Sequence, residues 1–217
     1  MQGLRRPWML LAILVGVVGI AINFALVIPA EMAQSDLRPD GRSLIGALLY
    51  FWTYFTHLTN LGLILVYLGE LSGWGWLGWF RKPSTQTAFA GFITLVMVFY
   101  HFMLAPFFPL EGGYLLASTL LHYVAPLAYL GFWLLYTRHG ALKWRDLPFM
   151  LIPGAAYLAW VLLRGAFAAE YPYDILDVGK NGYVGVAIGV GVIMVAVSIF
   201  CALLIWLDGR LARRVAA

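Results

Sequence analysis

Six long apolar segments dominate the sequence and restrict the folds that it can adopt. Each holds about 20 or more residues, the length that a helix needs to cross the hydrocarbon core of a bilayer. With 63% of its 217 residues hydrophobic and only 11% charged, the chain has the composition of a membrane protein. We therefore predict one all-α integral membrane domain, residues 1–217, folded as a bundle of six transmembrane helices. These helices are expected at about residues 8–28, 44–69, 87–108, 114–136, 147–167 and 183–207.

The basic residues predict how this bundle is oriented. The first apolar run, which follows Arg5 and Arg6, is about twice as long as the apolar region of a signal peptide and is expected to be retained as a helix. With alternating loops, ten of the 14 Lys and Arg residues fall on one side of the membrane and four on the other. The positive-inside rule then places both termini in the cytoplasm of a multi-pass protein of the cell (inner) membrane. The four on the outer side are Arg38, Arg42, Arg164 and Lys180.

Charge and cysteine content exclude several classes of function. The formal charge of +4 is small and spread over loops, which indicates membrane orientation rather than a nucleic-acid partner. Cys201 is the only cysteine, so the chain forms no intrachain disulfide and no cysteine-based metal cage. Since no phosphate-binding loop or dinucleotide fingerprint is present, no cofactor is expected.

The second predicted helix carries a polar stripe within the segment FWTYFTHLTN, residues 51–60. Thr53, Thr56, His57 and Asn60 are spaced at i, i+3, i+4 and i+7, so one continuous helix presents all four on one face. Polar side chains are costly in hydrocarbon, and this face is expected to point into the bundle. The stripe predicts either a functional site or a seam between helices.

Depth in the membrane pairs this stripe with the fourth predicted helix. At about 1.5 Å per residue, Thr53 lies roughly 14 Å and His122 roughly 12 Å from the outer surface. His101 lies roughly 10 Å deep and His57 nearer 20 Å. Pro126 lacks the N–H that the carbonyl of His122 would bond, so a bend is expected there.

These residues allow more than one chemistry. A Thr hydroxyl beside a His forms a nucleophile with its general base, but it also bonds the carbonyl four residues earlier with no chemical role. A metal or haem site built from His57, His101 and His122 would lack any closely spaced ligand motif. A transporter or ion pathway would use the charged residues near the fifth and sixth helices as an outer vestibule. Those residues are Arg164, Glu170, Asp174 and Asp177.

Three short motifs in order suggest a family. FWTYFTHLTN in the second helix, LLHYVAP in the fourth and YPYDILDVG before the sixth resemble the androgen-induced and androgen-dependent TFPI-regulating membrane proteins, and more closely their bacterial relatives. The animal members are threonine-dependent hydrolases that cleave fatty acid esters of hydroxy fatty acids. The resemblance implies Thr53 as nucleophile and His122 as its partner. Thr56 and Asn60 stand where the animal proteins have Asp and Gln, the His-to-Pro gap is four residues instead of five, and Asp174 replaces the usual bacterial Pro.

The expected function is therefore intramembrane hydrolysis of a lipid ester that enters from the outer half of the bilayer. His122 takes the proton of Thr53, and Thr56, His57 or Asn60 bonds the developing oxyanion. His101, Tyr171 and Tyr173 are expected to contact the substrate, with the turn at residues 171–173 covering the site. The expected partners are the bilayer and a membrane lipid or fatty ester. The alternative is a non-enzymatic transporter, channel or lipid-binding protein.

Overall fold

The computed structural model describes residues 2–34 and 40–215, which form helices and no strand. Arg38, counted above for the outer side, lies outside the described residues. The α-helices are α1 (Gln2–Met32), α2 (Leu44–Phe51), α3 (Phe55–Ser72), α4 (Pro83–Phe99), α5 (Gly112–Thr119), α6 (Ala125–Tyr136), α7 (Leu147–Ala168) and α8 (Val178–Val215). Shorter 3₁₀ turns are η1 (Gly75–Arg81), η4 (Trp144–Asp146) and η5 (Asp174–Leu176), and two π-helical segments are η2 (Tyr100–Leu104) and η3 (Leu120–Val124).

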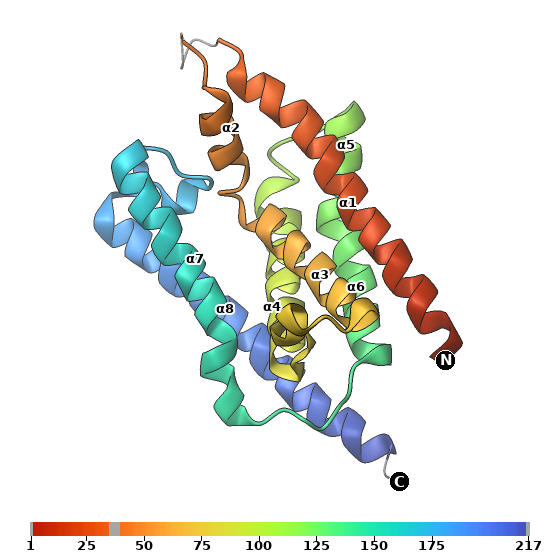
Figure 1. The fold of residues 1–217 in the computed structure, drawn as a ribbon. Helices are drawn as coiled ribbons and strands as arrows, with labels where there is room; N and C mark the ends of the chain where they lie inside the picture. The colour runs from red at the N-terminus through yellow and green to blue at the C-terminus, as the bar shows by residue number, and fades with distance from the viewer. Residues whose placement is uncertain (1, 35–39, 216–217) are drawn as a thin grey trace. The chain divides into compact units, whose positions relative to one another are not determined.

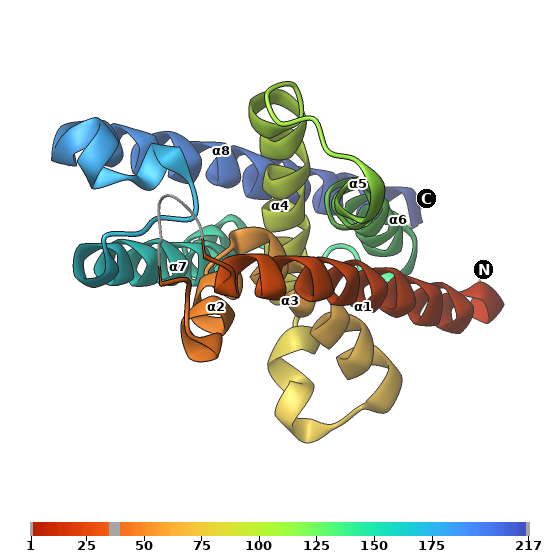
Figure 2. The same ribbon diagram turned by 90° about the horizontal axis from the view of Figure 1, so that it is seen from above.

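The helices suit a multi-pass membrane protein. Within the described residues, five helical stretches are long and apolar enough to cross a membrane, and a sixth is added if α3 and η1 count as one span. These two elements meet at a bend of 118°, and Figure 2 shows η1, in yellow, turning away from α3. The expected all-helical membrane fold is thus confirmed, while the second span differs from the prediction.

The prediction of one continuous helix over residues 44–69 was wrong, because the chain leaves the helix at residues 52–54 between α2 and α3. The sequence from Tyr50 to Phe55 is YFWTYF, a run of aromatic and β-branched residues that have low helix propensity. At the break, side chains also donate hydrogen bonds to backbone carbonyls that a continuous helix would pair with backbone N–H groups. The Thr53 hydroxyl donates to the Leu49 carbonyl at 2.7 Å, and Nδ1 of His57 donates to the Phe51 carbonyl at 2.7 Å.

Other helix boundaries also differ from those expected. Pro29 does not end α1, which continues to Met32. A proline removes only its own N–H from the helical hydrogen bonds. The next turn still closes, because the Ala33 N–H donates to the Pro29 carbonyl at 3.0 Å. The last helix starts at Val178, but Gly182 interrupts it with a φ of 65°. Regular helix therefore begins at residue 183, as predicted.

The described residues divide into two compact units. The first holds α1, α2, α3, η1 and the chain from Val96 to Tyr136. In it α1 contacts α3, α5 and α6, and Figure 1 shows α1, in red, running beside the green α5 and α6. The rings of Tyr67, Tyr129 and Phe132 pack together in its core. Trp8 ties α1 to α6 by donating its indole N–H to the Ala128 carbonyl at 3.0 Å.

The second unit holds residues Lys82–Leu95 and the chain that follows Tyr136. Here α7 packs against α8 (Figure 1) over a core of Leu158, Val161 and Leu176. The buried carboxylate of Asp208 on α8 accepts hydrogen bonds from His139 Nδ1 at 3.1 Å and from the Gly140 backbone N–H at 2.9 Å. These bonds fasten the loop before α7 to the far end of α8.

Gly165 on α7 gives a stability prediction for this unit. A Cβ added at Gly165 would lie 2.0 Å from Cε1 of Tyr171, so Gly165→Ala must displace that ring. We expect Gly165→Ala to lower the free energy of unfolding by about 1–3 kcal/mol, measured by thermal unfolding in detergent. The matched control is Gly191→Ala on α8, where an added Cβ meets nothing within 4 Å. Equal melting temperatures for the two variants would contradict this packing.

Candidate functional site

Two π-helical segments carry two of the three histidines of the first unit, and the third, His57, lies on α3. η2 holds His101 and η3 holds His122, and each segment ends two residues before a proline, Pro106 or Pro126. In both, the alanine before the proline donates its backbone N–H to the carbonyl five residues earlier, because the proline itself has no N–H to offer. The irregularity expected at Pro126 thus takes the form of a widened turn, a feature that is frequent at functional sites.

The ring of His122 is held on three sides. Its Nδ1 lies 3.0 Å from the Ser118 carbonyl oxygen and 3.0 Å from the Ser118 hydroxyl. Tyr100 stacks on the imidazole with ring centroids 3.9 Å apart and planes 15° from parallel. Since a carbonyl only accepts, Nδ1 carries the proton and donates it, which leaves the lone pair of the neutral ring on Nε2.

Thr56 faces that lone pair. Its Oγ1 lies 3.3 Å from Nε2 of His122, and the hydroxyl is placed to donate. Asn60, one turn along α3, donates its amide nitrogen to the Thr56 carbonyl at 2.9 Å and to the Leu121 carbonyl at 3.2 Å. Asn60 therefore joins α3 to η3 beside the Thr56–His122 pair.

Thr53 lies in the break between α2 and α3, and not on the helical face that carries Thr56 and Asn60. It is buried, and its hydroxyl bonds the carbonyl four residues earlier, which is the non-chemical alternative considered for a threonine in a helix. The sequence paired Thr53 with His122, and the structure shows Thr56 within hydrogen-bond distance of Nε2.

His57 has both ring nitrogens engaged. Nδ1 donates to the Phe51 carbonyl, so Nε2 of the neutral ring is an acceptor. The side-chain amide of Asn23 on α1 lies 3.1 Å from Nε2, and its nitrogen is the donor that this acceptor requires. The ring also stacks on Phe51 with centroids 3.9 Å apart. His57 thus satisfies a carbonyl that the broken helix leaves without its regular partner. Neither His57 nor Asn60 has an N–H to spare for an oxyanion in this arrangement.

The other residues predicted for the site make local contacts. His101 is exposed, and its Nδ1 lies 3.1 Å from the hydroxyl of Tyr123. Tyr171 and Tyr173 belong to the second unit, where they pack against its apolar core. In the same unit, ion pairs join Arg164 to Glu170 at 3.1 Å and Lys180 to Asp174 at 2.6 Å. These four charged residues form local pairs.

Residues that the sequence reasoning missed complete the site. Ser118 precedes His122 by one turn of the same helix, a spacing that marks a possible contact, and Tyr100 reaches the imidazole from η2. Among the described residues, no three His, Cys, Asp or Glu side chains gather as a metal site would require.

The candidate site is therefore a buried hydroxyl, Thr56, that faces the unprotonated nitrogen of a fixed imidazole, His122. Such a pair is chemically able to generate an alkoxide nucleophile. Comparison of the chain with family models, with curated proteins and with solved structures finds no match.

Proposed function

We propose that the chain is an intramembrane hydrolase of lipid esters, in which His122 deprotonates the hydroxyl of Thr56. The observation that supports it is the 3.3 Å approach of Thr56 Oγ1 to His122 Nε2, with Nδ1 anchored on the Ser118 carbonyl. This is the arrangement of a nucleophile with a general base that a third group orients. The carbonyl takes the place that a carboxylate holds in a Ser-His-Asp triad.

Thr56 is preferred to Thr53 as the nucleophile. The Thr53 hydroxyl donates its proton to the Leu49 carbonyl, and a hydroxyl held in that way must break a buried bond before it can react. The Thr56 hydroxyl instead faces a nitrogen that can accept its proton. The resemblance to the androgen-induced protein family supports the same reaction class, but it implies Thr53 as the nucleophile and places Asp at the position of Thr56.

The proposed reaction has two halves. The Thr56 proton moves to His122 Nε2 as Oγ1 attacks the ester carbonyl, and the imidazolium then protonates the departing alcohol. The product is an acyl ester on Thr56. His122 next takes a proton from water, the hydroxide attacks the acyl ester, and the fatty acid leaves while the proton returns to Thr56. No external oxidant or cofactor is consumed.

The proposed substrate is a fatty ester. The site lies on helices that carry long apolar runs and present many exposed apolar side chains, so a substrate dissolved in the bilayer reaches it without crossing water. Fatty acid esters of hydroxy fatty acids are the substrate class that the resemblance implies. We propose a location in the cell membrane, with both termini cytoplasmic, on the distribution of basic residues.

Thr56→Val tests the nucleophile, with Thr53→Val as its matched control because both changes replace a buried threonine by an isosteric apolar residue. We expect Thr56→Val to lower hydrolysis of a p-nitrophenyl fatty ester by roughly 10³-fold or more, and to abolish labelling by a fluorophosphonate. Thr53→Val should keep both. The reverse result would assign the nucleophile to Thr53.

If neither Thr56→Val nor Thr53→Val changes the rate of hydrolysis, the protein is not a threonine-dependent hydrolase. A parent protein without esterase activity that carries solute flux in liposomes would favour the transporter or channel.

A further inference from the structure

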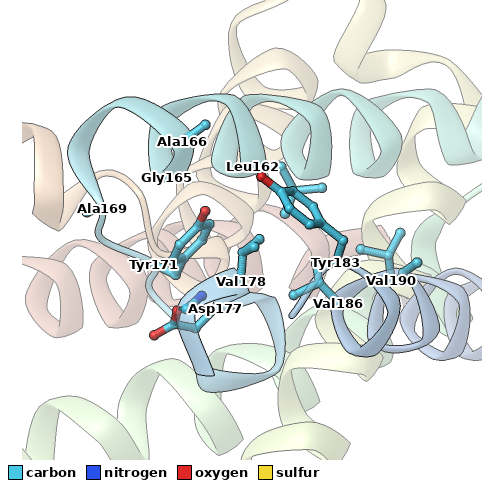
Figure 3. A pocket seen from close by; sticks show the side chains of 12 residues that line it. Leu162, Gly165, Ala166, Ala169, Tyr171, Asp177, Val178, Tyr183, Val186 and Val190 are labelled. Carbon is cyan, nitrogen blue, oxygen red and sulfur yellow. Dashed lines mark hydrogen bonds between the residues drawn. The ribbon is translucent and has the colours of Figure 1, made fainter. Parts of the chain in front are cut away.

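The second unit contains a cavity of about 750 Å³ between α7 and α8 (Figure 3). This volume falls within the range of about 300–1,000 Å³ that is typical of small-molecule sites. None of the residues that line it belongs to the Thr56–His122 site. Its walls are mainly apolar, with Leu162 and Ala166 on α7 and Val186, Ala187 and Val190 on α8.

The surroundings of this cavity indicate how a ligand enters. The lining residues Ala166 and Ala187 are exposed, so the mouth opens where they lie. Their sequence neighbours Phe167 and Ile188 are 85% and 64% exposed, and they sit on helices that are apolar enough to cross a membrane. A mouth framed by exposed apolar side chains admits a ligand from the hydrocarbon layer. The part that enters is therefore a long alkyl or acyl chain.

Three polar side chains also line the cavity: Tyr171, Tyr183 and Asp177. Figure 3 shows both tyrosine hydroxyl groups directed toward the helix that carries Leu162 and Ala166, with Asp177 below Tyr171. One carboxylate oxygen of Asp177 accepts the backbone N–H groups of Gly179 at 2.8 Å and Lys180 at 3.3 Å. Among the described residues, neither tyrosine hydroxyl has a hydrogen-bond partner in the protein.

The charges beside the cavity select among ligand head groups. Arg164 pairs with Glu170 and Lys180 pairs with Asp174, so both nearby cations already face a carboxylate. An anionic head would meet the Asp177 carboxylate without a cation to balance it. A head with hydroxyl groups can instead donate to Asp177 and exchange hydrogen bonds with Tyr171 and Tyr183.

We propose that this cavity binds a neutral amphiphile with one long alkyl chain and a glycerol-like head, the chain lying between α7 and α8 and the hydroxyl groups meeting Asp177. The site is independent of the proposed hydrolase, and it needs neither Thr56 nor His122.

The test uses 1-O-oleylglycerol, an ether that a hydrolase cannot cleave, titrated into the full chain in detergent and followed by native mass spectrometry. Ala187→Phe places a ring in the cavity, whereas Ile188→Phe adds a ring to the exposed face of the same helix turn. We expect saturable binding of one molecule to the parent and to Ile188→Phe, and an affinity lower by about tenfold or more for Ala187→Phe. Absence of binding to the parent, or equal affinity for the two variants, would overturn the site.

The head-group assignment has its own test. Oleate carries the same chain on an anionic head and is expected to bind the parent more weakly than the glycerol ether. Oleylamine carries it on a cationic head and tests whether the Asp177 carboxylate selects a cation instead. Asp177→Asn keeps an oxygen that can accept from Gly179 but removes the charge, so it should raise the affinity for oleate by about tenfold. Oleate or oleylamine binding the parent as tightly as the ether, or an unchanged oleate affinity in Asp177→Asn, would refute the neutral head.

Discussion

Replacing His122 by alanine is expected to lower lipid ester hydrolysis by about 10²–10⁴-fold, the usual contribution of a general base. The expectation rests on the Nε2 lone pair that faces the Thr56 hydroxyl and on the Ser118 carbonyl that fixes the proton on Nδ1. The measurement is the initial rate of fatty ester hydrolysis by purified protein in detergent. Labelling by a fluorophosphonate should fall in parallel, because Thr56 is then no longer deprotonated.

Imidazole added to the His122→Ala protein provides the control for this prediction. The half-buried ring of His122 leaves space when it is removed, and free imidazole can act there as an external base. Partial recovery of hydrolysis, with a melting temperature close to that of the parent, separates loss of a base from loss of folding. A His122→Ala protein that hydrolyses the ester at the parent rate would contradict the proposed role.

Much of the fold could be predicted because apolar runs of about 20 residues have few alternatives in a membrane. The break at residues 52–54 could not, since periodicity assumes that the backbone ladder is continuous. At this point the Thr53 hydroxyl and the His57 imidazole, and not backbone N–H groups of a regular helix, donate to the carbonyls of Leu49 and Phe51. Which of these donors bonds each carbonyl depends on contacts that the local sequence does not specify.

The same break explains why the sequence and the structure pair different threonines with His122. On a continuous helix Thr53 would share a face with Thr56 and Asn60, but the turn at residues 52–54 removes it from that face. The estimated depths placed this stretch and His122 in the same half of the membrane, but they could not distinguish Thr53 from Thr56, which are about one helical turn apart. The π turn at η3 also shifts side chains relative to a regular helix. The Ala-Pro pairs that directly follow both π segments were visible in the sequence.

The second large effect is expected at His57, where we predict that His57→Leu lowers the free energy of unfolding by about 2–4 kcal/mol. The substitution leaves the Phe51 carbonyl and the Asn23 side chain without the imidazole that they now meet. It also removes the stacked ring on Phe51. In a segment surrounded by apolar side chains, water does not readily replace these bonds. Thermal unfolding in detergent measures the loss.

A double-mutant cycle with Asn23→Leu separates the two contributions at His57. If Nε2 bonds Asn23 as its distance of 3.1 Å indicates, the double variant should be more stable than the sum of the single losses predicts, by about 0.5–3 kcal/mol. The reason is that each single variant leaves the other side chain, Asn23 or His57, without this hydrogen bond, whereas the double variant removes both side chains. The Phe51 carbonyl loses its 2.7 Å bond to the imidazole in both His57 variants and keeps only the long 3.5 Å bond from the Tyr54 N–H, so part of the loss should persist in the double variant. Strictly additive losses would show that Asn23 and His57 do not interact. The loss of stability in His57→Leu would then come from the contacts of the imidazole with Phe51.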